Sequence, residues 1–137
     1  MQEMPILTTL ELTNFRNYTK KSFKFDQGTT LIVGDNAVGK SNIVEAVWLL
    51  SAGKSFRATR DEQMIKAGEE LARVVGGELE IVLTRGAVAG QVAPKKRYLV
   101  NGIARRRVDF VGKLPAVLFR PEDVELVGGS PGGRRDY

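Results

Sequence analysis

The 137-residue chain contains no cysteine and no histidine. Without cysteine it can form neither a disulfide nor a thiolate metal site. Without histidine it lacks the side chain that most often acts as a general base near neutral pH and most often ligates a metal. These two absences exclude zinc hydrolases and enzymes built on a Ser-His-Asp triad.

Long apolar runs are also missing. The most apolar stretch, Ile43–Leu50, is far shorter than the roughly 20 residues that a membrane-spanning helix needs. The N-terminal sequence MQEMPILTTLEL lacks the basic region and the long apolar region that are typical of a signal peptide. We therefore expect a cytoplasmic protein with no membrane partner.

The composition that is present is that of a globular protein. Hydrophobic residues make up 42% of the chain and charged residues 27%, and the length fits one domain or part of one. The net charge of +5 favours a polyanionic partner such as nucleic acid. On net charge alone, however, ordinary solubilising charge is the simpler interpretation.

Hydrophobic patterning predicts strands first and then a helix. Leu10–Leu12 and Phe23–Phe25 alternate between apolar and polar residues, which is typical of half-buried strands. Thr29–Val33 is an apolar, β-branched run that predicts a fully buried strand. The helix is predicted over about Ser41–Ser51, and its apolar residues lie almost all round it, so we expect burial on more than one side.

The remainder of the chain mixes loops and strands, with Asn101–Gly102 as the strongest hairpin signal. The predicted elements are a polar loop with a short helix (Gly53–Glu70), a strand (Leu79–Leu83), a loop (Ala87–Pro94), a β-hairpin (about residues 95–106), a buried strand (Ala116–Phe119) and a helical first turn (Pro121–Asp123). Together these elements predict an α/β fold with a substantial antiparallel component.

The sequence GDNAVGKS, Gly34–Ser41, matches the phosphate-loop pattern G-x-x-x-x-G-K-[ST] at every fixed position. Glycine at both ends lets successive backbone N–H groups converge on phosphate oxygens without intruding side chains. The helix that begins near Ser41 aims its unpaired N–H groups at the same place. Lys40 would contact the β- and γ-phosphates, and the Ser41 hydroxyl would ligate Mg²⁺.

The surroundings of this loop also fit, because a predicted buried strand precedes it and a predicted helix follows it. The simpler alternative is a glycine-rich turn with an incidental lysine. We expect a purine nucleoside triphosphate with Mg²⁺ at this loop.

Several further stretches carry a family resemblance, in chain order: NFRNY, GKSFR, YLVNGIARRR, FRPEDVELVGGSP and RRDY. With the phosphate loop, they make the chain resemble the start of the RecF family of bacterial DNA repair proteins, over about Leu7–Tyr137. The resemblance implies a P-loop ATPase fold of the ABC class, similar to the first lobe of structural-maintenance-of-chromosomes heads, with a mixed or antiparallel β subdomain.

The resemblance also implies function and partners. RecF proteins bind ATP, dimerise on it, bind DNA at single-strand gaps and junctions, and work with RecR and RecO to load RecA. In related heads the NFR segment lies beside the nucleotide, so Asn14 and Arg16 are candidate contacts, whereas we expect Phe15 and Tyr18 to pack in the core. The predicted nucleotide-binding set is Arg16, Gly34, Asp35, Asn36, Ala37, Val38, Gly39, Lys40, Ser41 and Asn42.

The chain departs from the family pattern in two motifs. It contains no S-x-G-Q signature sequence and no apolar strand closed by paired acids, the Walker B motif. The family places both later, so the resemblance implies a single lobe here, with a second lobe expected beyond Tyr137. Glu122 or Asp123 could contact Mg²⁺ or could simply complement a helix N-terminus. We therefore expect this polypeptide to bind ATP and to hydrolyse it negligibly, because phosphoryl transfer needs stabilising charge around the γ-phosphate.

Basic residues form clusters that could contact DNA phosphates. The clusters are Lys95–Arg97 and Arg105–Arg107 on either side of the hairpin turn, Lys54 with Arg57 and Arg60, and Arg134–Arg135. A solvated basic surface explains them about equally well. Few aromatic residues lie among them, which weakens the case for stacking on single-stranded bases.

Two other functional classes stay open. A transporter-type nucleotide-binding subunit would share the phosphate loop, but it should carry a glutamine after Ala116–Phe119, where Arg120 and Pro121 stand instead. The chain could also be a folded interaction module whose nucleotide site stays empty.

Overall fold

The computed structural model describes residues 6–28 and 40–118. The predicted strand Thr29–Val33, the loop residues Gly34–Gly39 and the turn Pro121–Asp123 therefore lie outside the described residues, as do Phe119 and the Arg134–Arg135 cluster.

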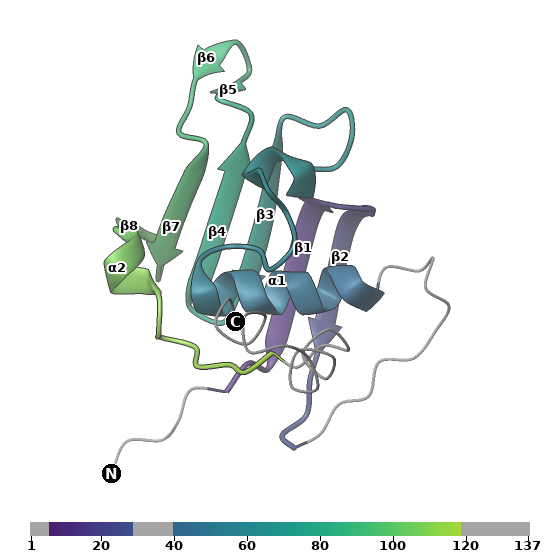
Figure 1. The fold of residues 1–137 in the computed structure, drawn as a ribbon, viewed down its shortest axis with the longest axis vertical. Coiled ribbons are helices and arrows are strands. Elements are labelled where there is room, and N and C mark those ends of the chain that lie inside the picture. The colour runs from purple at the N-terminus through teal and green to yellow at the C-terminus, as the bar shows by residue number, and fades with distance from the viewer. Residues whose placement is uncertain (1–5, 29–39, 119–137) are drawn as a thin grey trace, which may run out of the picture.

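An antiparallel sheet of six strands, in the order β2-β1-β3-β4-β7-β8, forms the body of the described part (Figure 1). Its strands are β1 (Thr9–Phe15), β2 (Tyr18–Lys24), β3 (Leu71–Gly76), β4 (Leu79–Thr84), β7 (Lys96–Val100) and β8 (Ile103–Arg105). The register pairs Leu10 with Phe23, Leu12 with Val74, and Val74 with Ile81. Directly opposed residues share a face of the sheet, so one face collects the apolar side chains.

Helix α1 (Lys40–Ala52) covers that apolar face (Figure 1). Its Ala46, Leu49 and Leu50 are fully buried with Leu12 and Val74 of the sheet in one core cluster. The short helices η2 (Asp61–Met64) and α2 (Arg107–Phe110) complete the described helical elements. The prediction of a helix over about Ser41–Ser51 is confirmed within one residue at each end. Its side toward the sheet is buried, whereas Val44 is 40% exposed and Val47 and Trp48 are partly exposed, so the expected burial on several sides is incomplete.

Strand β3 was not predicted, although it lies in the middle of the sheet between β1 and β4. Ala72 and Val74 are fully buried and alternate with the exposed Arg73, which is the period of a half-buried strand. The alternation is hard to recognise because the far-side neighbours Leu71 and Val75 are apolar too. Because aliphatic residues lie on both faces of β3, the sequence does not show the alternation of apolar and polar residues that is typical of a strand.

The segment between α1 and β3 largely follows the prediction. It is irregular apart from the single short helix η2, as expected for the polar run Gly53–Glu70. The prediction that Ala87–Pro94 is only a loop is wrong, because β5 (Ala87–Val88) and β6 (Gln91–Val92) pair in a small hairpin. Gly90 and Ala89, at φ of 79° and 52°, supply the tight turn that joins them.

The hairpin of about residues 95–106 is confirmed as the pair β7–β8, in which Tyr98 opposes Arg105 and Val100 opposes Ile103. Asn101 and Gly102 connect the strands with φ of 52° and 78°. Positive φ at both central positions is the requirement of a type I′ turn, which Asn-Gly meets at low cost.

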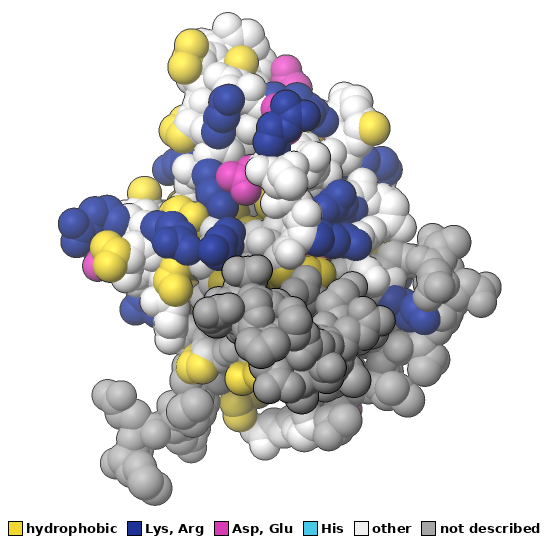
Figure 2. Space-filling model, viewed as in Figure 1, with side chains coloured by type: hydrophobic (Ala, Val, Ile, Leu, Met, Phe, Trp, Pro, Cys, Tyr) yellow, Lys and Arg dark blue, Asp and Glu magenta, His cyan; other side chains and the backbone are white. Residues whose placement is uncertain are grey.

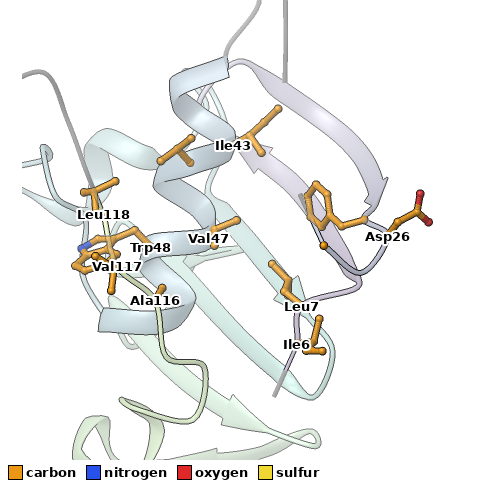
Figure 3. Close-up of a pocket in the computed structure, with 12 residues that line it drawn as sticks. Ile6, Leu7, Asp26, Ile43, Val47, Trp48, Ala116, Val117 and Leu118 are labelled. Atoms are coloured by element: carbon orange, nitrogen blue, oxygen red, sulfur yellow. The ribbon is translucent and has the colours of Figure 1, made fainter. Parts of the chain in front are cut away.

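The prediction of a buried strand at Ala116–Phe119 is wrong for its described residues. Ala116–Leu118 is not part of a strand, and Val117 is 96% exposed. These residues run beside Trp48 and Val47 of α1 and help to line a groove (Figure 3). A short apolar run fits either a strand or an extended segment beside a helix, and no strand among the described residues pairs with this one.

Candidate nucleotide-binding site at the start of α1

Helix α1 begins where the phosphate-loop motif ends. Lys40 is its first residue, and Ser41 and Asn42 follow in the first turn. Lys40 and Asn42 are partly exposed and Ser41 is exposed, so all three are accessible to a ligand. The first turn carries no acidic side chain. The positive end of the helix dipole is therefore reinforced by Lys40 rather than neutralised, which suits a bound anion.

A fully buried carboxylate lies one turn further along α1. Glu45 is 0% exposed and sits among the apolar residues that face the sheet. The Arg16 guanidinium donates two hydrogen bonds of 2.8 Å, one to each carboxylate oxygen. Arg57 donates a third bond of 3.0 Å, and the Ser55 hydroxyl donates a fourth of 2.6 Å. A buried charge is tolerated only with such a set of partners.

These contacts decide the protonation state of Glu45. Burial on its own would raise the pKa of the carboxyl, but the hydrogen bonds from Arg16, Arg57 and Ser55 outweigh it. The Arg16 charge acts in the same direction, and the pKa is lowered from 4.5 to about 2. Glu45 is thus ionised throughout the physiological range and fixes the two arginines beside it.

The turn that carries Arg16 is held in an unusual backbone conformation. Asn14 and Arg16 adopt φ of 49° and 54°, which non-glycine residues rarely do. The Arg16 amide donates to the Met64 carbonyl, and the Lys66 amide donates to the Asn14 carbonyl, both at 2.8 Å. Backbone hydrogen bonds on both sides therefore set the direction from which Arg16 reaches Glu45.

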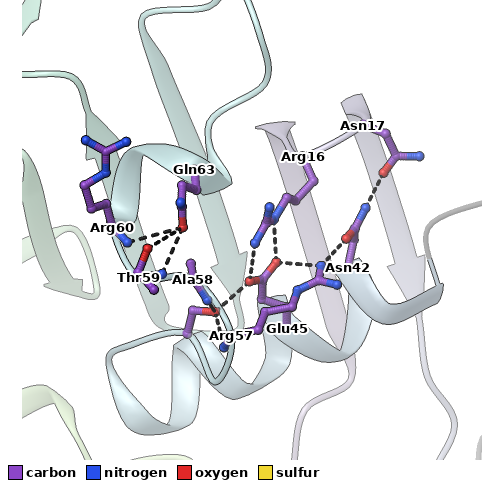
Figure 4. A network of polar contacts seen from close by, with 10 residues as sticks. Arg16, Asn17, Asn42, Glu45, Arg57, Ala58, Thr59, Arg60 and Gln63 are labelled. Carbon is purple, nitrogen blue, oxygen red and sulfur yellow. Dashed lines mark hydrogen bonds and ion pairs between the residues drawn. The ribbon is translucent and has the colours of Figure 1, made fainter.

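Asn42 joins the same network near the helix start (Figure 4). Its side-chain Nδ2 donates to the side-chain Oδ1 of Asn17 at 2.6 Å, and its own Oδ1 accepts a bond from Arg57. Arg57 thus bridges Asn42 and Glu45 along α1. The chain leaves the C-terminal end of the helix at Gly53 and folds back to bring Arg57 to its N-terminal half.

The structure brings together part of the predicted set. Two of its members, Arg16 and Asn42, share one network with Glu45 and Arg57, and Lys40 and Ser41 lie in the adjacent helical turn. The role of these residues in nucleotide binding stays a prediction. Phe15 is fully buried and Tyr18 packs against the core, as expected.

Sequence reasoning missed Glu45, Ser55 and Arg57 as partners of Arg16. One signal was available, because Glu45 is the only charged residue among the apolar residues from Ile43 to Leu50. A single carboxylate on a helix that is apolar all round requires a buried cationic partner. The sequence could not say which arginine supplies it, since Arg16 is 29 residues away.

The basic clusters differ in how their charges are used. Arg57 is bound to Glu45, Lys96 pairs with Asp61 at 3.2 Å, and Arg60 pairs with Glu62 at 3.4 Å. Other members have no ion-pair partner among the described residues: Lys54, Lys95, Arg97 and Arg105. Many Lys and Arg side chains gather on the face that carries η2 and α2 (Figure 2).

In residues 6–28 and 40–118 no helix is long and apolar enough to cross a membrane. The same residues hold no group of three or more acidic side chains that could bind a metal ion. Ser41, the predicted Mg²⁺ ligand, is exposed in the first turn of α1.

Comparison with known proteins assigns the family. Residues 6–109 match the model of the RecF/RecN/SMC N terminal domain, and the chain belongs to this family. The predicted fold class, a P-loop ATPase lobe of the ABC type with an antiparallel β subdomain, is confirmed.

Within the family the similarity is to RecF. The chain is 40% identical to the DNA replication and repair protein RecF of Geobacillus thermodenitrificans and 43% identical to that of Acidothermus cellulolyticus. Each alignment covers 96% of this chain but 36% of the relative, so the chain spans about a third of the length of these proteins.

Two solved structures agree with this placement. They are described as the recombination mediator protein RecF with ATP and with an ATP analogue, in the RecFOR pathway. Both are 33% identical to this chain, with TM-scores of 0.78 and 0.80, and each match covers 96% of this chain. The matched region is 37% and 36% of the respective solved chains. The resemblance to RecF is confirmed.

Proposed function

We propose that this chain is the nucleotide-binding part of a RecF-type DNA replication and repair protein. It binds ATP with Mg²⁺ at Gly34–Ser41, with Arg16 and Asn42 beside the site. DNA is its macromolecular partner in the cytoplasm, RecR acts with it, RecO and RecA follow downstream, and two copies of the whole protein dimerise on ATP.

The observation that carries the nucleotide proposal is the start of α1. A helix N-terminus with Lys40, Ser41 and no acid in its first turn suits a triphosphate, and it follows directly on the phosphate-loop sequence. Lys40 neutralises phosphate charge, and the Ser41 hydroxyl is an oxygen ligand of the kind that Mg²⁺ prefers. The relatives solved with ATP and its analogue support this choice of nucleotide.

Arg16 stays in the proposed site for a stereochemical reason. A guanidinium has five N–H donors, and Arg16 gives two of them to Glu45. Its side chain is 24% exposed, so other donors remain available to a phosphate, a ribose or a base. Glu45 would hold the guanidinium in one orientation for that contact.

Calorimetric titration with ATP and Mg²⁺ tests the proposal. We expect the unaltered chain to bind and Lys40→Ala to lose binding, because the substitution removes the cation from the phosphate site. Lys20→Ala, which removes an exposed lysine of β2, is the matched control and should bind normally. Unchanged affinity of Lys40→Ala would refute the site.

Hydrolysis is a separate expectation. The charged groups that the motif provides bind the triphosphate but do little to activate water, so phosphate release by this chain should be negligible. A malachite-green assay of released phosphate measures it. Turnover comparable with that of a complete RecF would contradict this expectation.

A further inference from the structure

The turn between β1 and β2 meets helix α1 at two positions that lie three residues apart. The Arg16 side chain reaches Glu45, and the Asn17 side chain accepts a hydrogen bond from Asn42. Residues three apart on a helix lie on the same side of it, so the turn runs along the first turns of α1 (Figure 4). Lys40 precedes Glu45 by about 7.5 Å along the helix axis. Arg16 is therefore held close to the end of α1 at which the nucleotide is proposed to bind.

The two hydrogen bonds to Glu45 use one edge of the Arg16 guanidinium. They come from Nε and Nη2, at 2.8 Å each. A guanidinium has a second edge, formed by Nη1 and the other N–H of Nη2, which also presents two donors side by side. Within the described part of the chain Nη1 of Arg16 has no acceptor, and the side chain is 24% exposed. This open edge matches a phosphate, which can accept such a pair of bonds through two of its oxygens.

Stability alone does not account for a carboxylate at position 45. Glu45 is the one charged residue of Ile43–Leu50, and replacing a buried ion pair by packed apolar side chains is often neutral or stabilising. An apolar side chain at this position could not fix the orientation of a guanidinium. The carboxylate can do so because it is itself held by four hydrogen bonds, two from Arg16 and one each from Arg57 and Ser55. It is a rigid support for a cation whose other edge is accessible.

We propose that Glu45 is a positioning residue for the nucleotide: it holds Arg16 so that the open edge of the guanidinium binds a phosphate of ATP. The inference rests on the proposed function, in which ATP binds at the start of α1. Glu45 is fully buried, so it acts through Arg16 and does not touch the nucleotide itself. Fixing the long Arg16 side chain before ATP arrives reduces the conformational entropy that binding would otherwise cost.

Positioning and simple electrostatics predict effects of opposite sign. Glu45 places a negative charge near a site for an anion, so its charge by itself opposes the binding of ATP. Glu45→Gln removes that charge and keeps the size of the side chain. If only charge mattered, this variant would bind ATP more tightly than the unaltered chain. If Glu45 positions Arg16, the variant binds ATP more weakly.

The test is a double-mutant cycle measured by calorimetric titration with ATP and Mg²⁺. It compares the unaltered chain, Glu45→Gln, Arg16→Ala and the variant that carries both substitutions. Glu80→Gln is the matched control, because it removes the same charge from an acid of β4 that pairs with Arg73. Circular dichroism fixes a temperature at which every variant is folded, so that differences in stability do not enter the affinities.

We expect Glu45→Gln to bind ATP about tenfold more weakly than the unaltered chain, the loss that corresponds to one hydrogen bond from a charged group. Glu80→Gln should bind ATP normally. In the Arg16→Ala background the change at position 45 should leave the affinity unchanged or raise it slightly, because only a repulsive charge is then removed. If Glu45→Gln does not fold, Glu45→Asp replaces it: the charge stays paired, but the carboxylate is withdrawn by one methylene, and ATP should again bind more weakly.

The outcomes separate this inference from the proposed function. If the unaltered chain does not bind ATP, the nucleotide site fails and the inference fails with it. If the chain binds ATP but Glu45→Gln, or Glu45→Asp in its place, binds it equally well or better, the inference is overturned while the nucleotide site stands. An equal loss with and without Arg16 would show that Glu45 supports only the fold, and would also overturn the inference.

Discussion

The two ends of α1 use arginine in opposite ways. Near the N-terminal end, Arg16 and Arg57 converge on Glu45, whose side chain is fully buried. Beyond the C-terminal end, Arg106 pairs with Asp109 in a contact where both side chains are exposed, 80% and 49%. The residue type is the same, but the burial of the acidic partner differs.

That difference decides what each arginine can do. A buried carboxylate without its partners would cost several kcal/mol, so Arg16 and Arg57 are required where they are. An exposed carboxylate is already solvated by water, so its partner contributes little and remains available to another anion. The buried ion pairs near the N-terminal end of α1 therefore stabilise the fold, whereas the exposed arginines beyond its C-terminal end remain accessible to other anions.

Removing the buried carboxylate should have the largest effect. We expect Glu45→Ala to lower the free energy of unfolding by about 3 kcal/mol near neutral pH, because it breaks four hydrogen bonds and leaves two arginines without their counter-charge. Urea denaturation measures the change. Glu80→Ala, which breaks the more exposed pair with Arg73, is the control and should cost less than about 1 kcal/mol. Equal losses in the two variants would remove the distinction between the ends of α1.

Acid should reproduce the same loss without a mutation. The pKa of Glu45 is lowered from 4.5 to about 2 in the folded chain, so its contribution is present above pH 4.5 and is lost as the pH falls through 2. A shift of this size corresponds to about 3 kcal/mol. The difference in unfolding free energy between the unaltered chain and Glu45→Ala should therefore shrink from pH 5 to pH 2. A difference that stays constant over this range would show that the carboxylate is not held ionised by its partners.

Local features at both ends of α1 could be predicted from the sequence. The phosphate-loop motif and the helix after it follow from local sequence, because the loop chemistry needs glycine, lysine and serine at fixed spacing. The hairpin at Asn101–Gly102 follows for the same reason, since its turn depends on two adjacent residues. The exposed arginines after β8 could likewise be placed from their position beside that turn.

What sequence could not supply were contacts between distant segments. The pairing of Arg16 with Glu45 depends on how β1 and α1 pack, and strand β3 is hidden by apolar residues on both of its faces. The prediction of a strand at Ala116–Leu118 was wrong for a related reason, because composition does not reveal whether a neighbouring strand is present. These three failures concern a tertiary partner rather than a local preference.

An intermediate effect is expected for the bond that fastens the hairpin to the C-terminal end of α1. Tyr98→Phe removes the 2.9 Å hydrogen bond to the Gly53 carbonyl but keeps the ring against Phe110. We expect a loss of about 1 kcal/mol in the free energy of unfolding, the usual contribution of one partly buried hydrogen bond. Thermal denaturation measures it. A loss as large as that of Glu45→Ala would mean that the C-terminal end is as tightly held as the N-terminal end.

The smallest effect on stability should come from the exposed acid at that end. Asp109→Asn removes the partner of Arg106, the residue that precedes α2, and such exposed pairs three residues apart contribute about 0.5 kcal/mol or less. The substitution changes one charge on the surface, so the free energy of unfolding should stay nearly constant. Urea denaturation measures the change. A loss of more than about 1 kcal/mol would show that Arg106 is tied into the fold as Arg57 is, and the contrast between the two ends of α1 would then be one of degree.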